Sequence, residues 1–387
     1  MIARIFIPLL LLIIIPDLYV HLHYLRHRVK SKWKQLIWWI PSVLMLAFTI
    51  YLAWGKGFAP GGVMLVNSYL FLLGVLVIPK AVFSICSFLG WRHCKFHKTK
   101  KNWGNIVGIL LAAGIIYIVV YGSTIGFNKI EVRHEDYYSS QLPKSFDGYR
   151  IVHLSDIHIG TYTNGNSWLL KAAIDSVNVQ HPDLIAFTGD LQNREPSELY
   201  PHIETLSALK ATDGVFSVRG NHDYADYIHA EPAVKVANER ELVSRQRQMG
   251  WNVLVNEHIS VRHGKDSIVI AGMENDGTGP FPKRGDVKKT MSGVSDNAFV
   301  LMLEHDPTSW RRNILPKSNA QLTLSGHTHA MQFSLFGWSP ASLIYDEWGG
   351  MFYEGDRAIN VSTGLGGFIP FRFGVTGEIV VVTLHSK

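Results

Sequence analysis

The sequence predicts an α+β protein in which membrane-spanning helices precede a domain of alternating strands and helices. Apolar residues make up 47% of the 387 residues, and charged residues make up 18%, below the ~25% typical of soluble chains. Charge also divides the chain: residues 1–130 hold 14 Lys and Arg against one acid, a net of +13, whereas residues 131–387 hold 23 against 30, a net of −7. The overall charge of +6 therefore belongs to the first part, and a basic face for nucleic acid is not supported.

Four apolar stretches in the first part are each near or above the ~20 residues that a helix needs to cross the hydrocarbon. A cleaved signal peptide is the alternative for the first stretch, but Asp17 follows its apolar run, no small-residue cleavage site is evident, and three more stretches follow. We therefore predict a four-helix transmembrane region over residues 1–125, with spans at about 5–25, 36–54, 62–89 and 104–125.

The loops between these spans predict the orientation, because cytoplasmic loops are enriched in Lys and Arg. Only Lys56 lies between the second and third spans. The other two loops are basic and are expected in the cytoplasm, which would place everything after Phe127 on the extracytoplasmic side. Their basic residues are Arg26, Arg28, Lys30, Lys32 and Lys34 in the first loop and Arg92, Lys95, Lys98, Lys100 and Lys101 in the third.

Two charged residues, Asp17 and Lys80, fall inside the apolar stretches, where charges are rare and often functional. The simpler interpretation is that Asp17 lies near the end of its helix and that Lys80 extends to the membrane interface. Pairing of the two across the first and third spans is the alternative.

The second domain is predicted over residues 149–387, after a linker at 126–148 that has mixed charge and ends in Pro143 and Gly148. Short runs rich in Val, Ile and Leu alternate there with helix-like stretches. Five of these runs end in carboxylate, amide or imidazole side chains. If the strands lie alongside one another, these groups meet at one site, and glycines at 189, 220 and 326 allow sharp turns and close approach of ligands. The five ends are Ser155-Asp156-Ile157-His158, Thr188-Gly189-Asp190, Arg219-Gly220-Asn221-His222-Asp223, Glu304-His305-Asp306 and Ser325-Gly326-His327-Thr328-His329.

These side chains offer oxygen and nitrogen ligands without sulfur, since both cysteines, Cys86 and Cys94, lie in the first part. Such ligands suit Mn, Fe, Zn, Co or a similar divalent ion. They exceed the demand of one ion, and two ions ~3.5–4 Å apart are the arrangement that phosphatases and nucleases use. With only Asp156 and Asp190 carrying negative charge, the site would stay cationic and attract a phosphate.

The motifs Asp156-x-His158, Gly189-Asp190, Gly220-Asn221-His222-Asp223, His305 and Gly326-His327-Thr328-His329, in this order, resemble those of the calcineurin-like metallophosphoesterases. The segments LSDIHIG, GLGG, PFRFGV and EIVVVTL are similar to the membrane-associated bacterial phosphodiesterase branch of that family. The resemblance covers residues 148–387. It implies a four-layer αββα sandwich and hydrolysis of phosphomono- or phosphodiesters by attack of a metal-bridging hydroxide.

The resemblance also implies a role for each motif residue. His222 would be the general acid that protonates the leaving-group oxygen, since the pKa of a histidine lies near neutrality. Asp190 would bridge two divalent ions. The first ion would be held by Asp156, His158, Asp190 and His329, and the second by Asp190, Asn221, His305 and His327.

Three positions depart from the family pattern. Asn193 stands where many relatives carry the carboxylate that pairs with the acid histidine, which leaves the orientation of His222 open. Glu304 stands where a small residue is common, and Ala330-Met331 replaces a frequent Gly-Gly pair. These changes leave the ligand set intact and affect the expected shape of the substrate pocket.

Several other residues have two interpretations. Asp223 is expected to be structural rather than catalytic, and His153, like other isolated histidines, is expected to have a structural or surface position. Arg372 either contacts a substrate phosphate or is an ordinary surface arginine. The aromatic-rich stretch 331–357 is either core or an apolar wall beside the metals. The charged stretch 232–249 is predicted to be a solvated helix face.

Together these features predict a membrane-anchored, dinuclear metal-dependent phosphoesterase that acts on a phosphorylated substrate beside the lipid bilayer. One alternative is a hydrolase of a lipid-linked nucleotide or pyrophosphate such as UDP-diacylglucosamine, which would require a cytoplasmic domain. Another is a membrane sensor that binds a phosphorylated ligand without turnover and keeps binding it when metals are removed.

Overall fold

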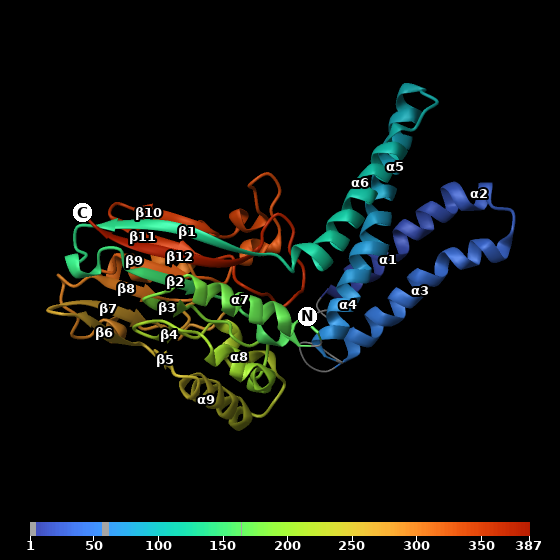
Figure 1. Cartoon of the computed structure of the whole chain (residues 1–387). Coiled ribbons are helices and arrows are strands. Elements are labelled where there is room, and N and C mark those ends of the chain that lie inside the picture. The colour runs from blue at the N-terminus through green and yellow to red at the C-terminus, as the bar shows by residue number, and fades with distance from the viewer. Residues whose placement is uncertain (1–4, 56–61, 164) are drawn as a thin grey trace. The chain divides into compact units, whose positions relative to one another are not determined.

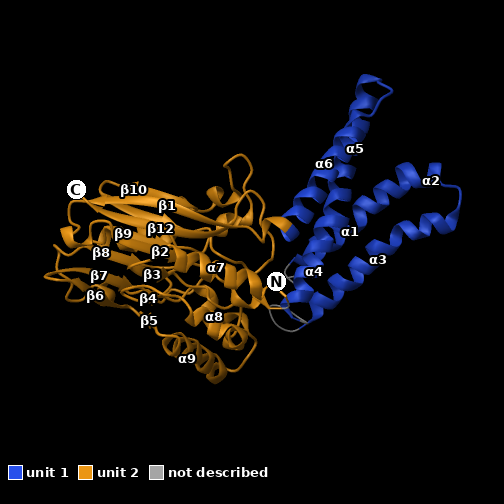
Figure 2. Cartoon of the chain, viewed as in Figure 1, with its two compact units in different colours: residues 1–124 blue, residues 125–387 orange. Residues whose placement is uncertain are grey.

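The computed structural model describes residues 5–55, 62–163 and 165–387. It divides the chain into two compact units, Met1–Thr124 and Ile125–Lys387, which Figure 1 shows by element and Figure 2 by unit. Lys56, which entered the prediction of orientation, lies outside the described residues.

Among the described residues of the first unit, four helical segments are long and apolar enough to cross a membrane, as the sequence predicted. Segments of π-helix continue three of them. The first span, Phe6–Arg28, comprises α1 (Phe6–Val20), η2 (His21–Leu25) and α2 (Arg26–Arg28); the second is α3 (Lys32–Trp54); the third, Val63–His97, comprises α4 (Val63–Leu72), η3 (Leu73–Val77) and α5 (Ile78–His97); the fourth, Trp103–Gly126, comprises α6 (Trp103–Tyr121) and η4 (Gly122–Gly126).

The third span is longer than predicted, because α5 continues past residue 89 and ends only before Lys98, whose φ of 54° is left-handed. Helix α5 also packs against α6. A Cβ atom on Gly104 would collide with the Cys86 carbonyl oxygen, so the two helices approach closely through a glycine. Arg92 and Lys95 therefore lie on a helix rather than in a loop.

Asp17 and Lys80 form an ion pair between α1 and α5, so the simpler interpretation of these two charges was wrong. Lys80 Nζ lies 2.8 Å from Asp17 Oδ1 and 2.9 Å from the Ser42 hydroxyl of α3. Asp17 is fully buried, and Ser42 also donates a hydrogen bond to it. Pairing prevails over extension to the interface because an unpaired buried charge is costly.

The second unit contains two six-stranded sheets whose orders are β1-β12-β2-β3-β4-β5 and β10-β11-β9-β8-β7-β6. In the first sheet β2, β3 and β4 are parallel neighbours, and in the second β8 and β9 are. The strands of the first sheet are β1 (Ile130–Ser139), β2 (Arg150–Leu154), β3 (Leu184–Phe187), β4 (Val215–Ser217), β5 (Trp251–Val253) and β12 (Gly377–Ser386); those of the second are β6 (Glu257–His263), β7 (Asp266–Gly272), β8 (Val300–Leu303), β9 (Leu322–Ser325), β10 (Gly350–Glu354) and β11 (Arg357–Val361).

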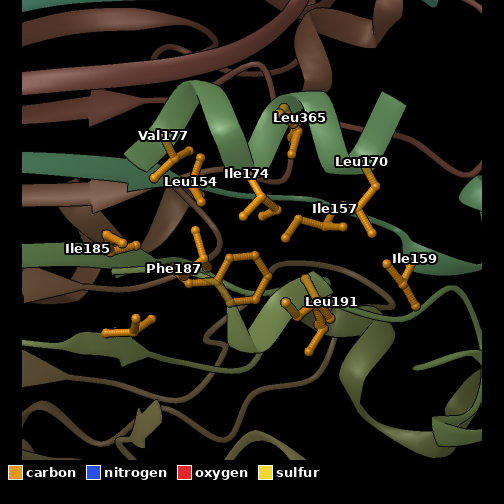
Figure 3. Close-up of a cluster of buried hydrophobic side chains, with 14 of the residues drawn as sticks. Leu154, Ile157, Ile159, Leu170, Ile174, Val177, Ile185, Phe187, Leu191 and Leu365 are labelled. Atoms are coloured by element: carbon orange, nitrogen blue, oxygen red, sulfur yellow. The ribbon is translucent and has the colours of Figure 1, made fainter. Parts of the chain in front are cut away.

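Three apolar clusters define four layers, as the αββα prediction requires. One cluster lies between the sheets and joins Ile151 of β2 to Leu301 of β8. A second covers the outer face of the first sheet; Figure 3 shows Ile174 of α7 directed toward Phe187 of β3. A third covers the outer face of the second sheet through Trp310. The helices of this unit are α7 (Ser167–Val179), α8 (Ile203–Ser207), α9 (Pro232–Gln248), α10 (Val287–Thr290) and α11 (Leu315–Lys317), with the π-helical turn η10 (Trp310–Ile314) and the 3₁₀ turns η5 (Lys144–Phe146), η6 (Ile159–Tyr162), η7 (Pro196–His202), η8 (Asn221–Asp223), η9 (Ala225–Tyr227), η11 (His329–Gln332) and η12 (Pro340–Leu343).

Strand β1 lies inside the segment 126–148, so the prediction of a linker there was wrong. It pairs in parallel with β12 from Ile130 opposite Gly377 to Ser139 opposite Ser386. Its charged residues obscured it, because β1 is an edge strand and several of them face solvent. The buried Tyr137 hydroxyl donates to the Gln321 carbonyl, so this segment belongs to the folded unit.

Candidate metal centre

The five predicted strand ends converge on one site, but they come from both sheets rather than from one. The ends of β2, β3 and β4 face those of β8 and β9. His305 Nδ1 donates to the Thr188 carbonyl at 2.7 Å, and the His327 backbone N–H donates to Asp156 Oδ2 at 3.0 Å. Because the Thr188 carbonyl can only accept, the Nδ1 atom of His305 carries a proton, and Nε2 is the atom through which this ring could bind a metal.

The site backbone is strained at the predicted ligands. Asp156, His158, Asp190, His327 and His329 all have a left-handed backbone, with φ between 50° and 71°. This conformation costs about 1–2 kcal/mol for a residue with a side chain, and such outliers cluster at functional sites. Gly326 shows how tightly the turns pack, because a Cβ atom there would collide with the side chains of Ser155 and Asp156.

Asp156, His158 and His329 form the first group of donors. His329 Nε2 lies 3.1 Å from Asp156 Oδ1 and 3.2 Å from His158 Nε2. Among the described residues, the buried Asp156 Oδ1 atom has no hydrogen-bond partner. A buried carboxylate oxygen that meets two imidazole nitrogens fits a divalent cation.

The second group joins Asn221, His305 and His327. Asn221 Oδ1 lies 3.2 Å from His305 Nε2 and 2.8 Å from His327 Nδ1. The Asp190 carboxylate connects the two groups: its Oδ2 atom lies 3.3 Å from His305 Nε2 and 3.6 Å from His158 Nε2. The structure thus brings all seven predicted ligand residues together.

The charges of the site favour a cation. Burial alone would raise the pKa of Asp190, but His305 and His222 lower it below the usual range. Burial disfavours the charged form of His305, yet Asp190 and Asp156 raise its pKa well above the usual value. Burial lowers the pKa of His158 well below the usual value, so this imidazole is neutral, as a metal ligand must be.

His222 is oriented by the backbone of Asn193 rather than by a carboxylate. Its Nδ1 atom donates to the Asn193 carbonyl at 2.7 Å, and its backbone N–H donates to Asp190 Oδ1 at 2.7 Å. The Asn193 side chain is directed elsewhere and donates to the Thr161 hydroxyl at 3.0 Å. This arrangement leaves His222 Nε2 available to a substrate, and burial lowers the pKa of the ring.

Sequence reasoning missed Tyr227. Its ring stacks on His222, with centroids 4.0 Å apart and planes 4° apart, and its hydroxyl accepts a hydrogen bond from Asn221 Nδ2 at 2.7 Å. It therefore contacts both the predicted acid and a predicted ligand. The sequence offered only an aromatic residue five positions after His222, with nothing to distinguish it from the buried Tyr224.

Both interpretations of Arg372 were wrong. The residue is fully buried, and its guanidinium donates to the carbonyls of Thr363, Gly364 and Thr376. It fixes the glycine-rich closing segment by satisfying backbone carbonyls, and it has no free face for a substrate.

Asp223 is structural, as predicted. Its carboxylate accepts from the backbone N–H groups of Gly220, Asp190 and Leu191 at 2.8–2.9 Å. It thereby holds the turns after β3 and β4 in register. His153 is also structural, since its buried ring contacts the side chains of Asn360 and Thr188 within 3.1 Å.

The positions that depart from the family pattern affect the surroundings of the predicted ligands. Glu304 is fully buried and accepts from the Asp276 backbone N–H at 2.9 Å. Burial raises its pKa well above the usual value, which favours the neutral carboxyl. Because it has no exposed surface, Glu304 does not line a substrate site. Ala330 is buried, whereas Met331 is exposed.

The stretches 331–357 and 232–249 divide between surface and core. Phe352 packs against the outer cluster of the second sheet, whereas Phe336 is exposed and the Tyr345 hydroxyl lies 3.3 Å from His327 Nε2. Helix α9 is mostly exposed, with Leu242 among its few buried residues, as predicted.

Known families match both units of the chain. Residues 3–127 match a family described as a probable calcineurin-like phosphoesterase, transmembrane domain, and residues 149–331 match one described as calcineurin-like phosphoesterase. The two matches follow the order of the two compact units.

Individual relatives are found in bacteria and in vertebrates. An uncharacterized metallophosphoesterase of Bacillus subtilis is 33% identical over 299 residues, which cover 74% of this chain and 96% of that protein. A transmembrane protein with a metallophosphoesterase domain from Danio rerio is 29% identical over 278 residues, 70% of this chain and 60% of that protein. A UDP-2,3-diacylglucosamine pyrophosphatase of Chlamydia trachomatis is 26% identical over 288 residues, 62% of this chain and 86% of that protein.

Proposed function

The chain belongs to the calcineurin-like phosphoesterases, a family of metal-dependent phosphoester hydrolases, and on that premise we propose that its second unit uses two divalent metal ions to hydrolyse phosphomonoester or phosphodiester bonds. One observation carries the proposal. Asp190 Oδ2 lies 3.6 Å from His158 Nε2 of one donor group and 3.3 Å from His305 Nε2 of the other. A single oxygen in this position can bridge two ions.

Each donor group supplies the ligands of one ion in this proposal. Bound divalent ions supply a water of lowered pKa and neutralise charge on the phosphoryl oxygens. Asp190 belongs to both sets. The first ion would be held by Asp156, His158, Asp190 and His329, and the second by Asp190, Asn221, His305 and His327.

His222 acts as the general acid. Its Nδ1–H is held by the Asn193 carbonyl, so the proton that it transfers is the one on Nε2. The imidazolium gives this proton to the oxygen of the departing group and becomes neutral. Burial favours the neutral ring, because it lowers the pKa of His222, and proton release is easier as a result.

The substrate and the side of the membrane are further parts of the proposal. The basic residues at the facing ends of the first and second spans and of the third and fourth spans support an extracytoplasmic catalytic unit. Similarity to a UDP-2,3-diacylglucosamine pyrophosphatase supports the alternative of a lipid-linked pyrophosphate substrate, for which a cytoplasmic unit is expected. A topology reporter fused after Lys387 separates the two alternatives.

The test is turnover by the purified full chain, which keeps β1 in place. Hydrolysis of bis(p-nitrophenyl) phosphate and p-nitrophenyl phosphate is measured with Mn²⁺ or with EDTA, and bound metal is counted by elemental analysis. We expect Mn²⁺-dependent turnover that falls by at least ~10³-fold in Asp190→Asn and stays unchanged in Asp175→Asn, an exposed control on α7.

Two outcomes contradict the proposal. Absence of both bound metal and turnover contradicts the proposed metal centre. Metal-independent binding of a phosphorylated ligand without turnover favours the sensor alternative.

A further inference from the structure

An apolar loop, residues 331–345, lies between the histidines that follow β9 and strand β10. It contains no charged residue, although the unit that carries it holds many. Large apolar side chains in the loop face solvent: Phe336 is 99% exposed, Leu343 76% and Ile344 65%, and Leu335 and Trp338 are also exposed. Exposed apolar residues gathered in one uncharged segment indicate an interaction surface.

The tip of the apolar loop has an unusual conformation. Leu335 and Trp338 exchange two backbone hydrogen bonds of 2.9 and 3.1 Å around a two-residue turn. Both turn residues are left-handed, with φ of 53° at Phe336 and 79° at Gly337. Such turns favour Asn-Gly, because asparagine tolerates this backbone better than an aromatic residue does. A phenylalanine that is both strained and fully exposed is explained by a contact outside the folded unit.

Hydrogen bonds fix the loop beside the metal centre. The Ser339 hydroxyl donates to the Ala330 carbonyl at 2.6 Å, and the Ser334 backbone N–H donates to the Phe373 carbonyl at 2.8 Å. At the other end of the loop, the Tyr345 hydroxyl lies 3.3 Å from Nε2 of His327. Whatever the tip contacts is therefore held at a defined position relative to the ligand histidines.

The bilayer suits this tip better than a protein does. The last candidate span ends at Gly126 and β1 begins at Ile130, so three residues separate that span from the first strand of the second unit. Phe, Trp, Leu and Ile without charge are the residues that enter the region between headgroups and acyl chains. The loop's exposed large side chains are apolar, and the next charged residue along the chain, Asp346, lies just beyond it.

We propose that the tip of the apolar loop, Leu335–Trp338 together with Leu343 and Ile344, inserts into the bilayer that holds the chain's own helices. The metal centre is then positioned at the headgroup level, where it meets phosphate esters attached to lipid. This substrate class rests on the proposed phosphoesterase function, whereas the insertion itself does not.

The test places a fluorescent probe at the tip of the full chain. Cys86 and Cys94 are replaced by serine, Phe336→Cys is labelled with an environment-sensitive dye, and the protein is reconstituted in phosphatidylcholine/phosphatidylglycerol vesicles that contain spin-labelled lipid. The matched control is Val234→Cys on α9, an apolar position that is 48% exposed. Both positions are exposed, so labelling leaves the core intact.

We expect the spin-labelled lipid to quench the probe at 336 at least twofold and to leave the probe at 234 unchanged. Equal, weak quenching at both positions overturns the proposal. It is overturned as well if the probe at 336 is shielded in native membranes but not in lipid-only vesicles, since a protein then covers the loop.

Quenching needs no turnover, so the two proposals fail separately. If the probe at the tip is quenched but the protein is inactive, only the proposed phosphoesterase function is contradicted. If the protein is active but the probe is not quenched, only the proposed insertion is contradicted.

Discussion

Two clusters of buried charge occur in this chain, and they differ in whether their charges are satisfied. In the first unit Lys80 contacts both oxygens of Asp17 within 2.9 Å and also Ser42, and none of these three residues has a left-handed backbone. In the second unit the Asp156 and Asp190 carboxylates meet several imidazoles, and the Asp156 Oδ1 atom has no hydrogen bond among the described residues.

The backbone shows the same difference. Five predicted metal ligands have a left-handed φ, which is unfavourable and persists only where the surrounding structure imposes it. The difference indicates that a closed ion pair stabilises helix packing, whereas a strained cluster of carboxylates and imidazoles is arranged for a cation and for chemistry. Substitutions in the first cluster should therefore change stability, and substitutions in the second should change activity.

The largest effect is expected at the second cluster, for His222→Ala. Loss of a general acid lowers kcat by roughly 10²–10⁴-fold. The loss should be greatest for a substrate with a poor leaving group and smaller for p-nitrophenyl esters, because a good leaving group needs less protonation. Steady-state kinetics on both kinds of substrate measure this.

His229→Ala, an exposed histidine outside the cluster, serves as the control and should retain full activity. An equal loss in His222→Ala for good and poor leaving groups contradicts a proton-donor role. The thermal unfolding temperature of His222→Ala should stay close to that of the parent.

At the first cluster, a substitution should lower stability and leave activity unchanged. Asp17→Asn leaves Lys80 without a counter-charge, and breaking a buried pair in this way costs about 3–5 kcal/mol. Replacing both residues by apolar ones, Asp17→Leu with Lys80→Met, should recover most of that stability. Thermal unfolding in detergent measures both variants.

Turnover per folded molecule should be unchanged in the single and the double variant. A double variant that is no more stable than Asp17→Asn contradicts the interpretation of a closed pair. Loss of turnover in a stable double variant would instead assign a functional role to this pair.

A smaller effect is expected at Tyr227, which contacts both the predicted ligand Asn221 and the predicted acid His222. Tyr227→Phe keeps the ring on His222 but removes the acceptor of Asn221 Nδ2. Loss of such a supporting contact lowers metal affinity by roughly 10–100-fold. Activity titrated with Mn²⁺ should show the change in half-saturating metal concentration, with kcat at saturating Mn²⁺ little altered.

Tyr227→Leu also removes the stacked ring and should lower kcat in addition. Tyr200→Phe is the control, since that exposed hydroxyl bonds to Glu241 on α9 and not to the metal centre. An unchanged Mn²⁺ requirement in Tyr227→Phe would show that Asn221 needs no support.

The convergence of the candidate ligands could be predicted because each lies near the end of a short apolar strand, in a local motif. Asp156, Asp190 and His305 could be named from their neighbours in the sequence alone. The division of these strands between two sheets could not be predicted, because it depends on strand pairings, such as β8 with β9, that local sequence does not encode.

The missed features depend on partners that are distant in the sequence. Tyr137 of β1 bonds to Gln321, and Lys80 pairs with Asp17 across 63 positions. Arg372 was misinterpreted for a related reason: an arginine that satisfies backbone carbonyls has no sequence signature that separates it from one at the surface.

The smallest predicted effect concerns Glu198, which supports the loop that orients His222. Its Oε2 atom accepts from the Asn193 N–H at 2.6 Å and the Arg194 N–H at 3.3 Å, and burial raises its pKa to about 7 from an ordinary value of 4.5. The folded state therefore binds this proton more tightly than the unfolded state, so its contribution to stability is present below about pH 4.5 and is lost as the pH rises through about 7. We expect a loss on the order of 1–2 kcal/mol.

Glu198→Gln removes this titration. Thermal unfolding should show the variant close to the parent at pH 5 and more stable than the parent at pH 8, while the exposed control Glu204→Gln follows the parent at both values. If the parent and Glu198→Gln lose stability in parallel from pH 5 to pH 8, the pH dependence of stability arises from another group. Glu198 is then no part of the arrangement that holds His222, which ends at the carbonyl of Asn193.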